Sequence, residues 1–479
     1  MDNERIQKLS EFESAGINAY PYSYVVSAYS KDIHSCYDEL EGTIQTIAGR
    51  IVQKRDFGSL IFCHLQDSKG RIQTMARAEE LDKDKMSLFA KFDLGDIIGV
   101  EGTVTKTKKG EISLSVHDFT LLSKSISFLP DKFKGLSDTE IRYRKRYLDL
   151  IANPNIKEYF VVRAKLIESI RSFLNSRGYL EVDTPILQKV YGGAAAKPFT
   201  TVHNALDEKL YLRISNELYL KRLIIGGMGK VFEFSKDFRN EDIDSTHNPE
   251  FTQVEFYEEY KDYNDYMQLT KELFSKIFSD LSLPTQLAFQ GKTIDFTKFE
   301  TVSLYEEIKK KSGVDMLKWK DAEQAYSECV KAGIKPSKHT LAKCMDALFT
   351  EFVEPSLHNP TFVIDFPYFA CPLTKRKRGN PELAERFELF IAGYELGNCY
   401  SELTDPREQR KKFEEQAKSL NAGDEESTPI DNDFLEAIEY GMPPTAGYGI
   451  GIDRLAMILT NNVSIKEVIL FPTMKEGGT

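Results

Sequence analysis

Five short runs of alternating apolar and polar residues follow one another between Gly42 and about Leu122. Each run ends at Gly, Asp or a Ser-Lys-Gly turn, as β-strands joined by short turns do. Five strands in so short a segment predict a small closed barrel. The five runs are TIAGRIVQKR, SLIFCHLQD, RIQTMAR, IIGVEGTVTKT and EISLSVHDFTLL.

The remainder of the chain mixes helices and strands. A helix that ends near Gly178 is predicted because Leu166, Ile167, Ile170, Phe173 and Leu174 share one of its faces. Strands alternate with loops over 179–260, helices dominate 261–350, and strands then resume before a final helix that opens at Arg454. Strands and helices segregated in this way favour an α+β fold over a doubly wound sheet.

These patterns predict four segments. The first is an N-terminal helix with an irregular stretch, and the second is the barrel. A charged linker leads from the barrel into a large domain that carries a mostly helical insertion. The expected boundaries are 1–40, 41–125, 126–154 and 155–479, with the insertion at about 261–355.

Composition narrows the class of protein. The polar start MDNERIQKLS is no secretory signal, and no apolar run approaches the ~18 residues of a membrane span. The six cysteines form no CxxC pair, which fits a reducing compartment, so a cytoplasmic protein without a membrane partner is expected. The net charge, 63 − 74 = −11, argues against non-specific coating of nucleic acid but leaves a local contact with RNA open.

Two arginines lie in polar, turn-rich surroundings far apart in the sequence: Arg239 in FRNEDIDSTHNPEF (238–251) and Arg454 in GYGIGIDR (447–454). A guanidinium binds phosphate oxygens bidentately and keeps its charge, so the pair predicts two contacts with one polyphosphate. The glycines at 447, 449 and 451 could belong to a dinucleotide site, but such a site needs a following βαβ unit. A tight strand-to-helix turn close to ATP is the preferred interpretation.

Together with GYLEVDTPIL (178–187), these segments resemble the three signature motifs of class II aminoacyl-tRNA synthetases. The resemblance implies an OB-fold barrel followed by a catalytic domain built on an antiparallel sheet flanked by helices. It also implies that Arg239 holds the α-phosphate and the substrate carboxylate, Arg454 holds the γ-phosphate, and Phe251 stacks under adenine. The other implied ATP-binding residues are Glu241, His247, Asn248, Glu388 and Glu395.

Glu388 and Glu395 belong to the run ERFELFIAGYELGNCYSELTDP (385–406) and can converge across a turn. Carboxylates are hard oxygen ligands, and Mg²⁺ commonly takes one or two of them together with substrate phosphates. Two glutamates in a charged chain are usually solvated, but an unpaired carboxylate in a buried strand is costly. The resemblance assigns both glutamates to Mg²⁺.

Asn398, Tyr400 and Glu402 alternate along the same run and therefore share one face of a strand. An amide, an aromatic ring and a carboxylate predict a pocket for a long substrate with a cation at its tip. Glu255 and Tyr257 repeat the pairing of carboxylate and ring. An amphipathic strand without a binding role is the alternative.

Further segments bring the resemblance to the lysyl-tRNA synthetase family: GGAAAKPF (192–199), NELYLKRLIIGG (216–227), HNPEFTQVEFY (247–257), YSELTDP (400–406) and IKEVILFP (465–472). The resemblance implies an ATP- and Mg²⁺-dependent homodimer that converts L-lysine to lysyl-adenylate and then transfers it to the terminal ribose of tRNA(Lys). It places Pro185, which lacks a ladder donor, at the edge or boundary of a strand in the dimer interface.

The same resemblance distributes the parts of lysine among the pocket residues. Gly192 or Gly193 and Glu217 would bind the α-amino group, with Glu255 close by. Arg239 and Asn398 would bind the carboxylate. Tyr400 would line the aliphatic stem, and Glu402 with Tyr257 would bind the ε-ammonium.

In the barrel, Phe62 lies on one predicted strand and Gln73 on the next. A ring for stacking beside an amide that reads a base edge is typical of proteins that recognise single-stranded RNA loops. The spacing matches the anticodon-reading pair of the aspartyl, asparaginyl and lysyl group, although a phenylalanine in a strand is often core. Arg50 and Glu111 are further candidates on the same basis.

Three other functions are weighed against this one. A lysine ligase that modifies a protein would resemble the catalytic domain alone, and the barrel argues against it. A degenerate synthetase acting as a scaffold would lack a phosphate arginine or a metal glutamate. Aspartyl or asparaginyl specificity would place a cationic residue where Glu255 and Glu402 stand.

Overall fold

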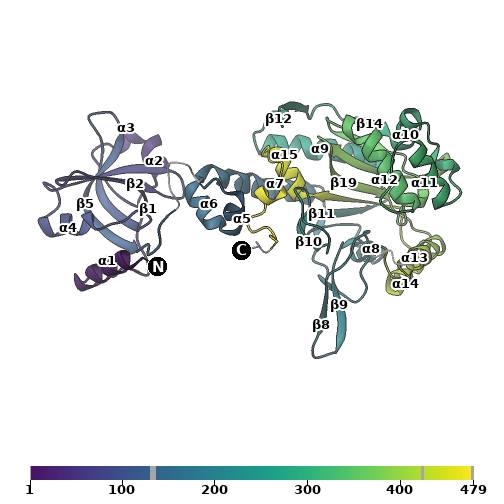
Figure 1. The fold of residues 1–479 in the computed structure, drawn as a ribbon, viewed down its shortest axis with the longest axis horizontal. Coiled ribbons are helices and arrows are strands. Elements are labelled where there is room, and N and C mark those ends of the chain that lie inside the picture. Colours follow the sequence, from purple (N-terminus) through teal and green to yellow (C-terminus); the bar gives the residue numbers. More distant parts are fainter. Residues whose placement is uncertain (1, 130–135, 422–425, 476–479) are drawn as a thin grey trace. The chain divides into compact units, whose positions relative to one another are not determined.

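A computed structural model describes residues 2–129, 136–421 and 426–475. They form two compact units, one of residues 1–138 and 151–153 and the other of residues 139–150 and 154–479 (Figure 1). Residues 130–135 of the expected linker lie outside the described residues. In the part of the chain that the structure describes, no helix is both long and apolar enough to cross a membrane.

The first unit is a closed five-stranded barrel with the strand order β1-β2-β3-β5-β4. Residues of β2 alternate between half-buried and buried, because successive side chains of a strand point to opposite faces. Ile61, Cys63 and Leu65 thus enter the barrel core, while Phe62 and His64 face outward. The predicted barrel is confirmed. Its strands are β1 (Ile44–Asp56), β2 (Leu60–Gln66), β3 (Arg71–Arg77), β4 (Ile97–Lys106) and β5 (Ile112–Ser123).

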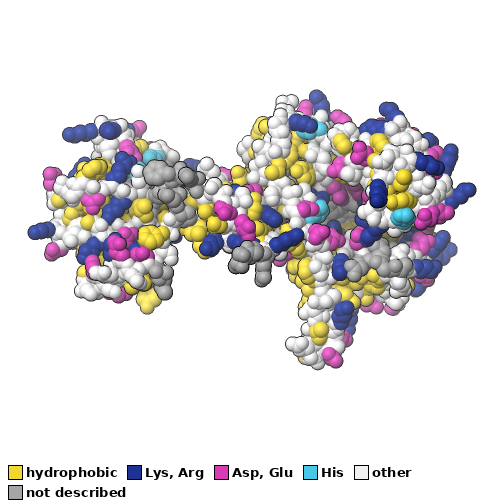
Figure 2. All heavy atoms as spheres, in the orientation of Figure 1, with side chains coloured by type: hydrophobic (Ala, Val, Ile, Leu, Met, Phe, Trp, Pro, Cys, Tyr) yellow, Lys and Arg dark blue, Asp and Glu magenta, His cyan; other side chains and the backbone are white. Residues whose placement is uncertain are grey.

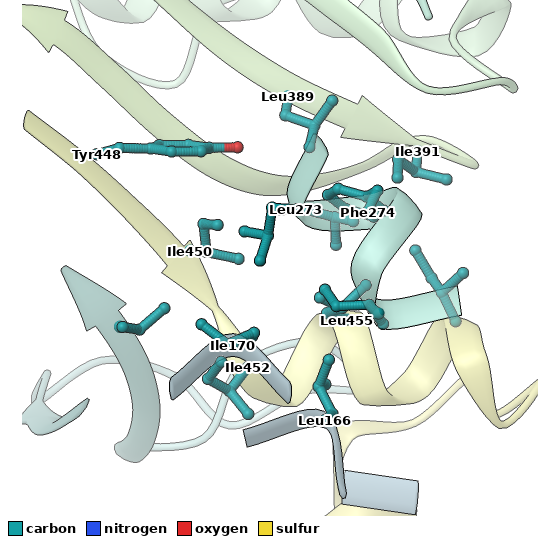
Figure 3. Packing of buried hydrophobic residues seen from close by; sticks show 14 of the residues in the cluster. Leu166, Ile170, Leu273, Phe274, Leu389, Ile391, Tyr448, Ile450, Ile452 and Leu455 are labelled. Atoms are coloured by element: carbon teal, nitrogen blue, oxygen red, sulfur yellow. The ribbon is translucent and has the colours of Figure 1, made fainter. Parts of the chain in front are cut away.

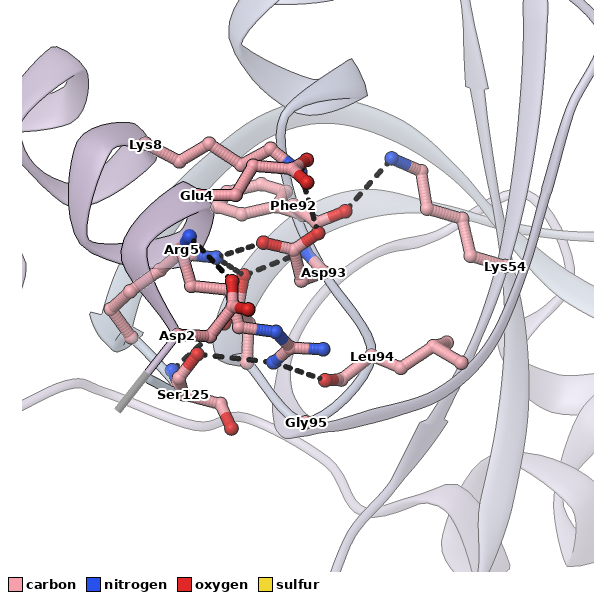
Figure 4. Close-up of polar contacts among 12 residues, drawn as sticks. Asp2, Glu4, Arg5, Lys8, Lys54, Phe92, Asp93, Leu94, Gly95 and Ser125 are labelled. Atoms are coloured by element: carbon pink, nitrogen blue, oxygen red, sulfur yellow. Dashed lines mark hydrogen bonds and ion pairs between the residues drawn. The ribbon is translucent and has the colours of Figure 1, made fainter. Parts of the chain in front are cut away.

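The N-terminal helix α1 (Asn3–Ser14) is held to the barrel by polar contacts of Arg5, which is buried, and of Lys8, which pairs with Asp93 (Figure 4). Nη1 of Arg5 donates to the carbonyl oxygens of Leu94 at 2.9 Å and Ser125 at 3.1 Å. Phe12 of the same helix stacks on Phe92 in the barrel core. The short helices of this unit are α2 (Ser30–Ser35), α3 (Tyr37–Leu40) and α4 (Lys83–Ala90).

The stretch expected as a charged linker contains two helices, α5 (Thr139–Arg144) and α6 (Arg146–Ala152). Arg146 is fully buried, and its guanidinium forms an ion pair with Asp149 at 2.7 Å. The same guanidinium donates to the carbonyl oxygens of Lys466 at 2.6 Å and Leu470 at 3.1 Å. Burial of this charged residue is tolerated because its guanidinium has these acceptors, two of which lie more than 300 residues further along the chain.

The second unit is built on an eight-stranded sheet with the order β14-β15-β18-β19-β20-β11-β10-β6. Neighbouring strands are antiparallel except for the pairs β14–β15 and β6–β10. The strands are β6 (Leu180–Glu181), β10 (Lys230–Phe238), β11 (Glu250–Glu259), β14 (Glu300–Ser303), β15 (Thr361–Ile364), β18 (Arg386–Ile391), β19 (Tyr394–Ser401) and β20 (Thr445–Gly451).

Helices α7, α9 and α15 pack on one face of this sheet around an apolar core (Figure 3). The predicted stripe on α7 is confirmed, because Leu166, Ile170, Phe173 and Leu174 are all buried in that core. The predicted α+β fold is therefore confirmed. The helices of this unit after α6 are α7 (Lys157–Ser176), α8 (Glu217–Ile225), α9 (Tyr263–Asp280), α10 (Leu304–Ser312), α11 (Ala322–Lys331), α12 (Leu341–Phe352), α13 (Pro406–Asn421), α14 (Asn432–Glu439), α15 (Ile452–Leu459) and α16 (Ile465–Val468).

Three smaller sheets complete the unit, and the β8–β9 hairpin projects from its body (Figure 1). The first contains β7 (Leu187–Gln188), β8 (Thr200–His203) and β9 (Glu208–Leu212). The other two are hairpins, β12 (Gln286–Phe289) with β13 (Lys292–Asp295), and β16 (Arg376–Lys377) with β17 (Asn380–Ala384).

Candidate active site

A cavity of about 430 Å³ in the second unit brings together most of the predicted site residues. They come from the loop after β7, the start of α8, the segment between β10 and β11, strand β11, strand β19 with the residue after it, and the turn from β20 into α15. The predicted residues that line the cavity are Gly192, Gly193, Glu217, Arg239, Glu241, His247, Asn248, Phe251, Glu255, Tyr257, Glu395, Asn398, Tyr400, Glu402 and Arg454.

Strand β20 forms the middle of the cavity floor, and its glycines keep that floor open. Gly447 pairs with Tyr257 of β11 on one side and with Tyr400 of β19 on the other. A Cβ atom on Gly447 would lie 2.2 Å from Oε1 of Glu402 and 2.2 Å from the ring of Tyr257. The glycines therefore belong to a strand that borders the cavity and leads directly into helix α15. The predicted strand-to-helix turn is confirmed.

Arginines gather at one end of the cavity. Nε of Arg239 is buried and has no hydrogen-bond partner among the described residues, and the guanidinium carbon lies 5.0 Å from the centroid of the Phe251 ring. Arg454 donates from Nη1 to the carbonyl oxygen of Glu395 at 2.9 Å, and its Nη2 is 3.1 Å from Nε2 of His247. These donors face a common space and suit the oxygens of a polyphosphate.

His247 is oriented by its neighbour in the loop. Its Nδ1 lies 2.8 Å from Oδ2 of Asp244. Because Arg454 is donor-only, Nε2 of His247 must accept, which leaves the ring proton on Nδ1 facing Asp244. The loop thus holds the His247 ring between Asp244 and Arg454.

Two other predicted ATP-binding residues differ in their surroundings. Glu241 is exposed at the rim of the cavity. Asn248 is buried, with Nδ2 donating to the carbonyl oxygen of Glu250 at 2.6 Å and Oδ1 accepting from the backbone of Thr473 at 3.1 Å. The Asn248 amide is thus occupied in holding the loop.

Three buried carboxylates gather at the other end of the cavity: Glu217, Glu255 and Glu402. Burial raises the pKa of Glu255 to about 8, and nearby Glu217 adds to the shift. Burial also raises the pKa of Glu402 to about 8, although a neighbouring ammonium opposes the shift. Such a cluster is costly unless cations receive it.

Tyr257 does not bond to Glu402, with which the sequence paired it. Its hydroxyl donates to Oε2 of Glu255 at 2.9 Å. Gln253 and Ser215 donate to the other oxygen of Glu255, at 2.6 and 3.2 Å. Glu255 is therefore fixed by three donors of the chain, whereas neither oxygen of Glu402 forms a well-directed hydrogen bond among the described residues.

The sequence interpretation missed two cations of this site. Lys221 of α8 is fully buried, and its ammonium forms ion pairs with Glu217 and, at 2.5 Å, with Oε2 of Glu402. Arg386 donates from Nε to Oδ1 of Asn398 at 3.1 Å and forms an ion pair with Glu388. Two signals could have found them: the i, i+4 spacing of Glu217 and Lys221 on a helix, and the shared strand face of Arg386 and Glu388.

The glutamates predicted for Mg²⁺ lie on adjacent antiparallel strands, β18 and β19. Burial raises the pKa of Glu388 to about 8, Arg386 opposes the shift, and the charge of Glu395 adds to it. No cluster of three or more metal-ligating side chains occurs in the described part of the chain. Glu395 lines the cavity, whereas Glu388 does not and is paired with Arg386. Two neighbouring carboxylates fit an ion that takes its other ligands from substrate and water.

The glycine loop reaches the start of α8. Gly193 has a φ of +85°, and a Cβ atom there would lie 2.9 Å from Oγ of Ser215 and 3.1 Å from Cβ of Glu217. Glycine is therefore required for this close approach. The loop backbone and Glu217 border the same part of the cavity.

Pro185 lies outside the cavity, between the short strands β6 and β7. It is exposed, as are the apolar side chains of Leu180, Ile186 and Leu187 around it. Strand β6 is the edge of the eight-stranded sheet.

In the barrel, Phe62 lies on the outer face, where its ring meets that of Phe57 edge-on at 6.3 Å. Phe57 is largely exposed, and the sequence interpretation missed it.

The three polar candidates in the barrel all have partners within the chain. Gln73 is buried and donates to Oγ of Ser113 at 2.8 Å. Arg50 donates to the carbonyl oxygen of Gly95 at 2.8 Å, and Glu111 meets His64 at 2.9 Å. Of the four candidates, Glu111 is exposed, Arg50 and Phe62 are partly buried, and Gln73 is buried.

On the face drawn in Figure 2, basic and acidic side chains are interspersed over each unit. A broad basic stripe does not cover that face of the described residues. Contacts with a polyanion are therefore expected to be local, in keeping with the acidic net charge.

Comparisons with known proteins agree with this geometry. Residues 138–475 match a model of the family "tRNA synthetases class II (D, K and N)", and residues 45–122 match a model of the "OB-fold nucleic acid binding domain". Among curated proteins, the chain is 46% identical to the lysine–tRNA ligase of Carboxydothermus hydrogenoformans over 98% of this chain and 97% of that protein. It is 47% identical to those of Pelotomaculum thermopropionicum and Moorella thermoacetica, over 98% of this chain and 94% and 97% of those proteins.

Proposed function

Because this chain belongs to the lysine–tRNA ligases, within the class II tRNA synthetases of the D, K and N group, we propose that it activates L-lysine with ATP and transfers it to tRNA(Lys). The observation that carries the proposal is the separation of opposite charges within one cavity. Two guanidiniums, of Arg239 and Arg454, face one end, and the buried carboxylates of Glu217 and Glu402 face the other. A polyphosphate suits the first end, and an amino acid with two ammonium groups suits the second.

In the first step, a carboxylate oxygen of lysine attacks the α-phosphorus of ATP, and the bond to the β-phosphate oxygen breaks. The carboxyl group has a pKa of roughly 3.5, so it is ionised at pH 7 and no general base is needed. Arg239 holds both reacting groups, and Arg454 with His247 holds the departing pyrophosphate. Catalysis is then mainly positioning and charge stabilisation.

In the second step, a hydroxyl of the terminal ribose of the tRNA attacks the carbonyl carbon of the adenylate, and AMP leaves. Arg239 remains beside the α-phosphate that departs with AMP. Phe251 supports the adenine ring, and Glu241 and Asn248 belong to the loop that borders it.

Glu388 and Glu395 would hold Mg²⁺, which would neutralise charge on the ATP phosphates when bound. Their mutual repulsion supports this assignment. Arg386 fixes the side chain of Glu388 and that of Asn398, so it links the metal site with the residue proposed to bind the lysine carboxylate.

Selection of lysine rests on the carboxylate end. The backbone of Gly192 and Gly193 and the side chain of Glu217 receive the α-amino group, with Glu255 close by. Tyr400 lines the aliphatic stem. Glu402 receives the ε-ammonium, with Tyr257 packed beside it.

This function is tested by ATP–pyrophosphate exchange with each of the twenty amino acids in turn. Exchange that depends on lysine, and on no other amino acid to a comparable extent, is the expected result. Exchange that depends on aspartate or asparagine would refute the proposal that Glu217 and Glu402 bind the ammonium groups of lysine.

The barrel, 41–125, is proposed to read the anticodon, and 155–479 to form the catalytic domain. The edge-on pair of Phe57 and Phe62 on the outer face supports this division. A base can stack on such a ring. Arg50 on β1 and Glu111 just before β5 are the further candidates for contact with the anticodon. Gln73 would have to give up its bond to Ser113 to read a base edge.

Phe62→Ala is expected to lower charging of tRNA(Lys) roughly 10-fold or more, because stacking of one base on a ring contributes about 1–3 kcal/mol. Pyrophosphate exchange should not change, since it needs no tRNA. Aminoacylation and exchange assays measure the two steps. Tyr22→Ala, which removes an exposed ring from the same unit, is the matched control and should leave both unchanged.

We also propose a homodimer whose interface includes Pro185 and the exposed apolar residues beside it. Static light scattering at micromolar concentration is expected to give twice the 54.7 kDa of one chain. Leu187→Asp should shift the protein toward monomer, because a carboxylate is costly in an apolar interface. Tyr440→Asp, at a residue exposed elsewhere on the unit, should remain dimeric. A fully active wild-type monomer would rule out this interface.

The compartment proposed is the cytoplasm. All six cysteines are free thiols, five of them buried, which suits a reducing environment. The proposed partner, tRNA(Lys), is used there in protein synthesis.

A further inference from the structure

Lys221 lies beside the carboxylates that are proposed to bind the two ammonium groups of the substrate, so this site already contains a cation of the chain itself. It is the fifth residue of α8 and is fully buried. Its ammonium forms ion pairs with Glu217, the proposed partner of the α-amino group, and with Glu402, the proposed partner of the ε-ammonium. One lysine of the chain thus connects the two carboxylates that receive the two ends of the substrate.

Charge balance shows what this arrangement requires. The carboxylate end holds Glu217, Glu255 and Glu402, and Lys221 is the one ammonium that forms ion pairs with them among the described residues. Lys375 acts on Glu402 without forming an ion pair, and Arg386 is paired with Glu388. Bound lysine would add two ammonium groups, which makes three cations for three carboxylates. Its carboxylate would be met separately by Arg239. Monocationic amino acids would leave one buried carboxylate without a counter-ion, at a high cost.

We propose that Lys221 is a positioning residue of the lysine pocket that sets its selectivity for a substrate with two ammonium groups. It does so by holding Glu217 and one oxygen of Glu402, which leaves the other oxygen of Glu402 for the ε-ammonium. This inference rests on the proposed function and adds to it a residue that does not itself touch lysine.

The two oxygens of Glu402 support this division. Oε2 lies 2.5 Å from Nζ of Lys221. Oε1 has no hydrogen-bond partner among the described residues, and it lies over Gly447, whose missing side chain leaves room beside it. An ammonium that reached Oε1 would lie against the ring of Tyr257, since that ring borders the same space.

Because the three glutamates must be ionised to bind ammonium groups, binding of lysine is expected to depend on pH. Burial raises the pKa of all three glutamates, and the charge of Lys221 opposes the rise for Glu217 and Glu402. Without Lys221 these pKa values would rise further, so fewer carboxylates would be ionised at pH 7 to receive lysine. The other charged or titratable groups that face the cluster are Asp237, Tyr257, Lys375, Arg386, Cys399 and Tyr400.

Lys221→Met tests the proposal, with ATP–pyrophosphate exchange as the assay. The KM for lysine should rise ~10²-fold at pH 7, while kcat and the KM for ATP stay within about threefold of wild type. As pH rises from about 6.5 to 8.5, the KM for lysine should fall more steeply in the variant than in wild type, because the carboxylates regain their charge. Lys412→Met removes another buried lysine, one paired with Glu415 outside the cluster, and should leave the KM unchanged.

A double variant tests the charge balance directly, once thermal unfolding has shown that Lys221→Met is folded. Lys221→Met combined with Glu255→Gln removes one charge of each sign and restores the balance of two carboxylates for two ammonium groups. Its KM should be lower than the product of the two single effects predicts. Additive effects, or a KM raised equally at every pH, would overturn the proposal.

Failure of this inference is distinguishable from failure of the proposed function. A wild-type protein that does not activate lysine would contradict the function itself. Wild-type activation of lysine together with an unchanged KM in Lys221→Met would contradict only the role of Lys221.

Discussion

Arg239→Ala is expected to lower lysine-dependent ATP–pyrophosphate exchange by about 10³-fold or more. Removal of one donor that stabilises developing charge typically costs ~10²–10³-fold in rate. Arg239 is proposed to hold two groups at once, the α-phosphate and the attacking carboxylate. Arg239 lines the cavity, its buried Nε has no hydrogen-bond partner among the described residues, and its guanidinium approaches the Phe251 ring.

The loss should appear in kcat/KM for both ATP and lysine. Arg407→Ala is the matched control, because that arginine is 89% exposed and pairs only with Asp405 among the described residues. Thermal unfolding should show that Arg239→Ala remains folded. Activity within tenfold of wild type would mean that another residue holds the α-phosphate.

Glu402→Gln is the second large effect that we expect. The side chain keeps its shape but cannot become an anion, so it isolates the electrostatic contribution. Losing one member of a buried ion pair costs roughly 3–5 kcal/mol, which corresponds to ~10²–10³-fold or more in activation of lysine. The KM for ATP should change little, since the phosphate end of the cavity is untouched.

The measurement is again exchange, at saturating ATP and varied lysine. Glu415→Gln, on the outer side of α13, is the control and should behave as wild type. Wild type should also bind lysine more tightly as pH rises toward 8, because Glu402 and Glu255 have pKa values of about 8 and must be ionised to receive ammonium groups. If Glu402→Gln activates lysine within about threefold of wild type, another group binds the ε-ammonium.

The elements predicted well are those whose pattern is local. The stripe on α7 and the alternation along β2 can be followed in the sequence because each residue's environment is set by its own helix or strand. Most of the residues predicted to bind ATP line one cavity, and their motifs were recognisable in the sequence because they resemble a known family; Glu388 does not line it.

The features that were missed depend on distant partners. Lys221 resembles an exposed residue of a charged helix, and although Glu217 is its neighbour on that helix, its second partner is Glu402, 181 residues later. Gln73 resembles a base reader in sequence, yet its amide bonds to Ser113 across the barrel. Helices α5 and α6 looked like a linker because Arg146 finds its acceptors on Lys466 and Leu470.

That last contact has a consequence for how the chain is made. Arg146 leaves the ribosome about 320 residues before the carbonyl oxygens that accept from it. At roughly 5–20 residues per second, this guanidinium remains without these acceptors for on the order of half a minute. A nascent chain stalled before Lys466 already contains both arginines proposed to bind phosphate, but it cannot bury Arg146 without a large cost. Helix α6 can therefore reach its final packing only after the segment from Lys466 to Leu470 has been synthesised, which delays completion of the catalytic unit until late in translation.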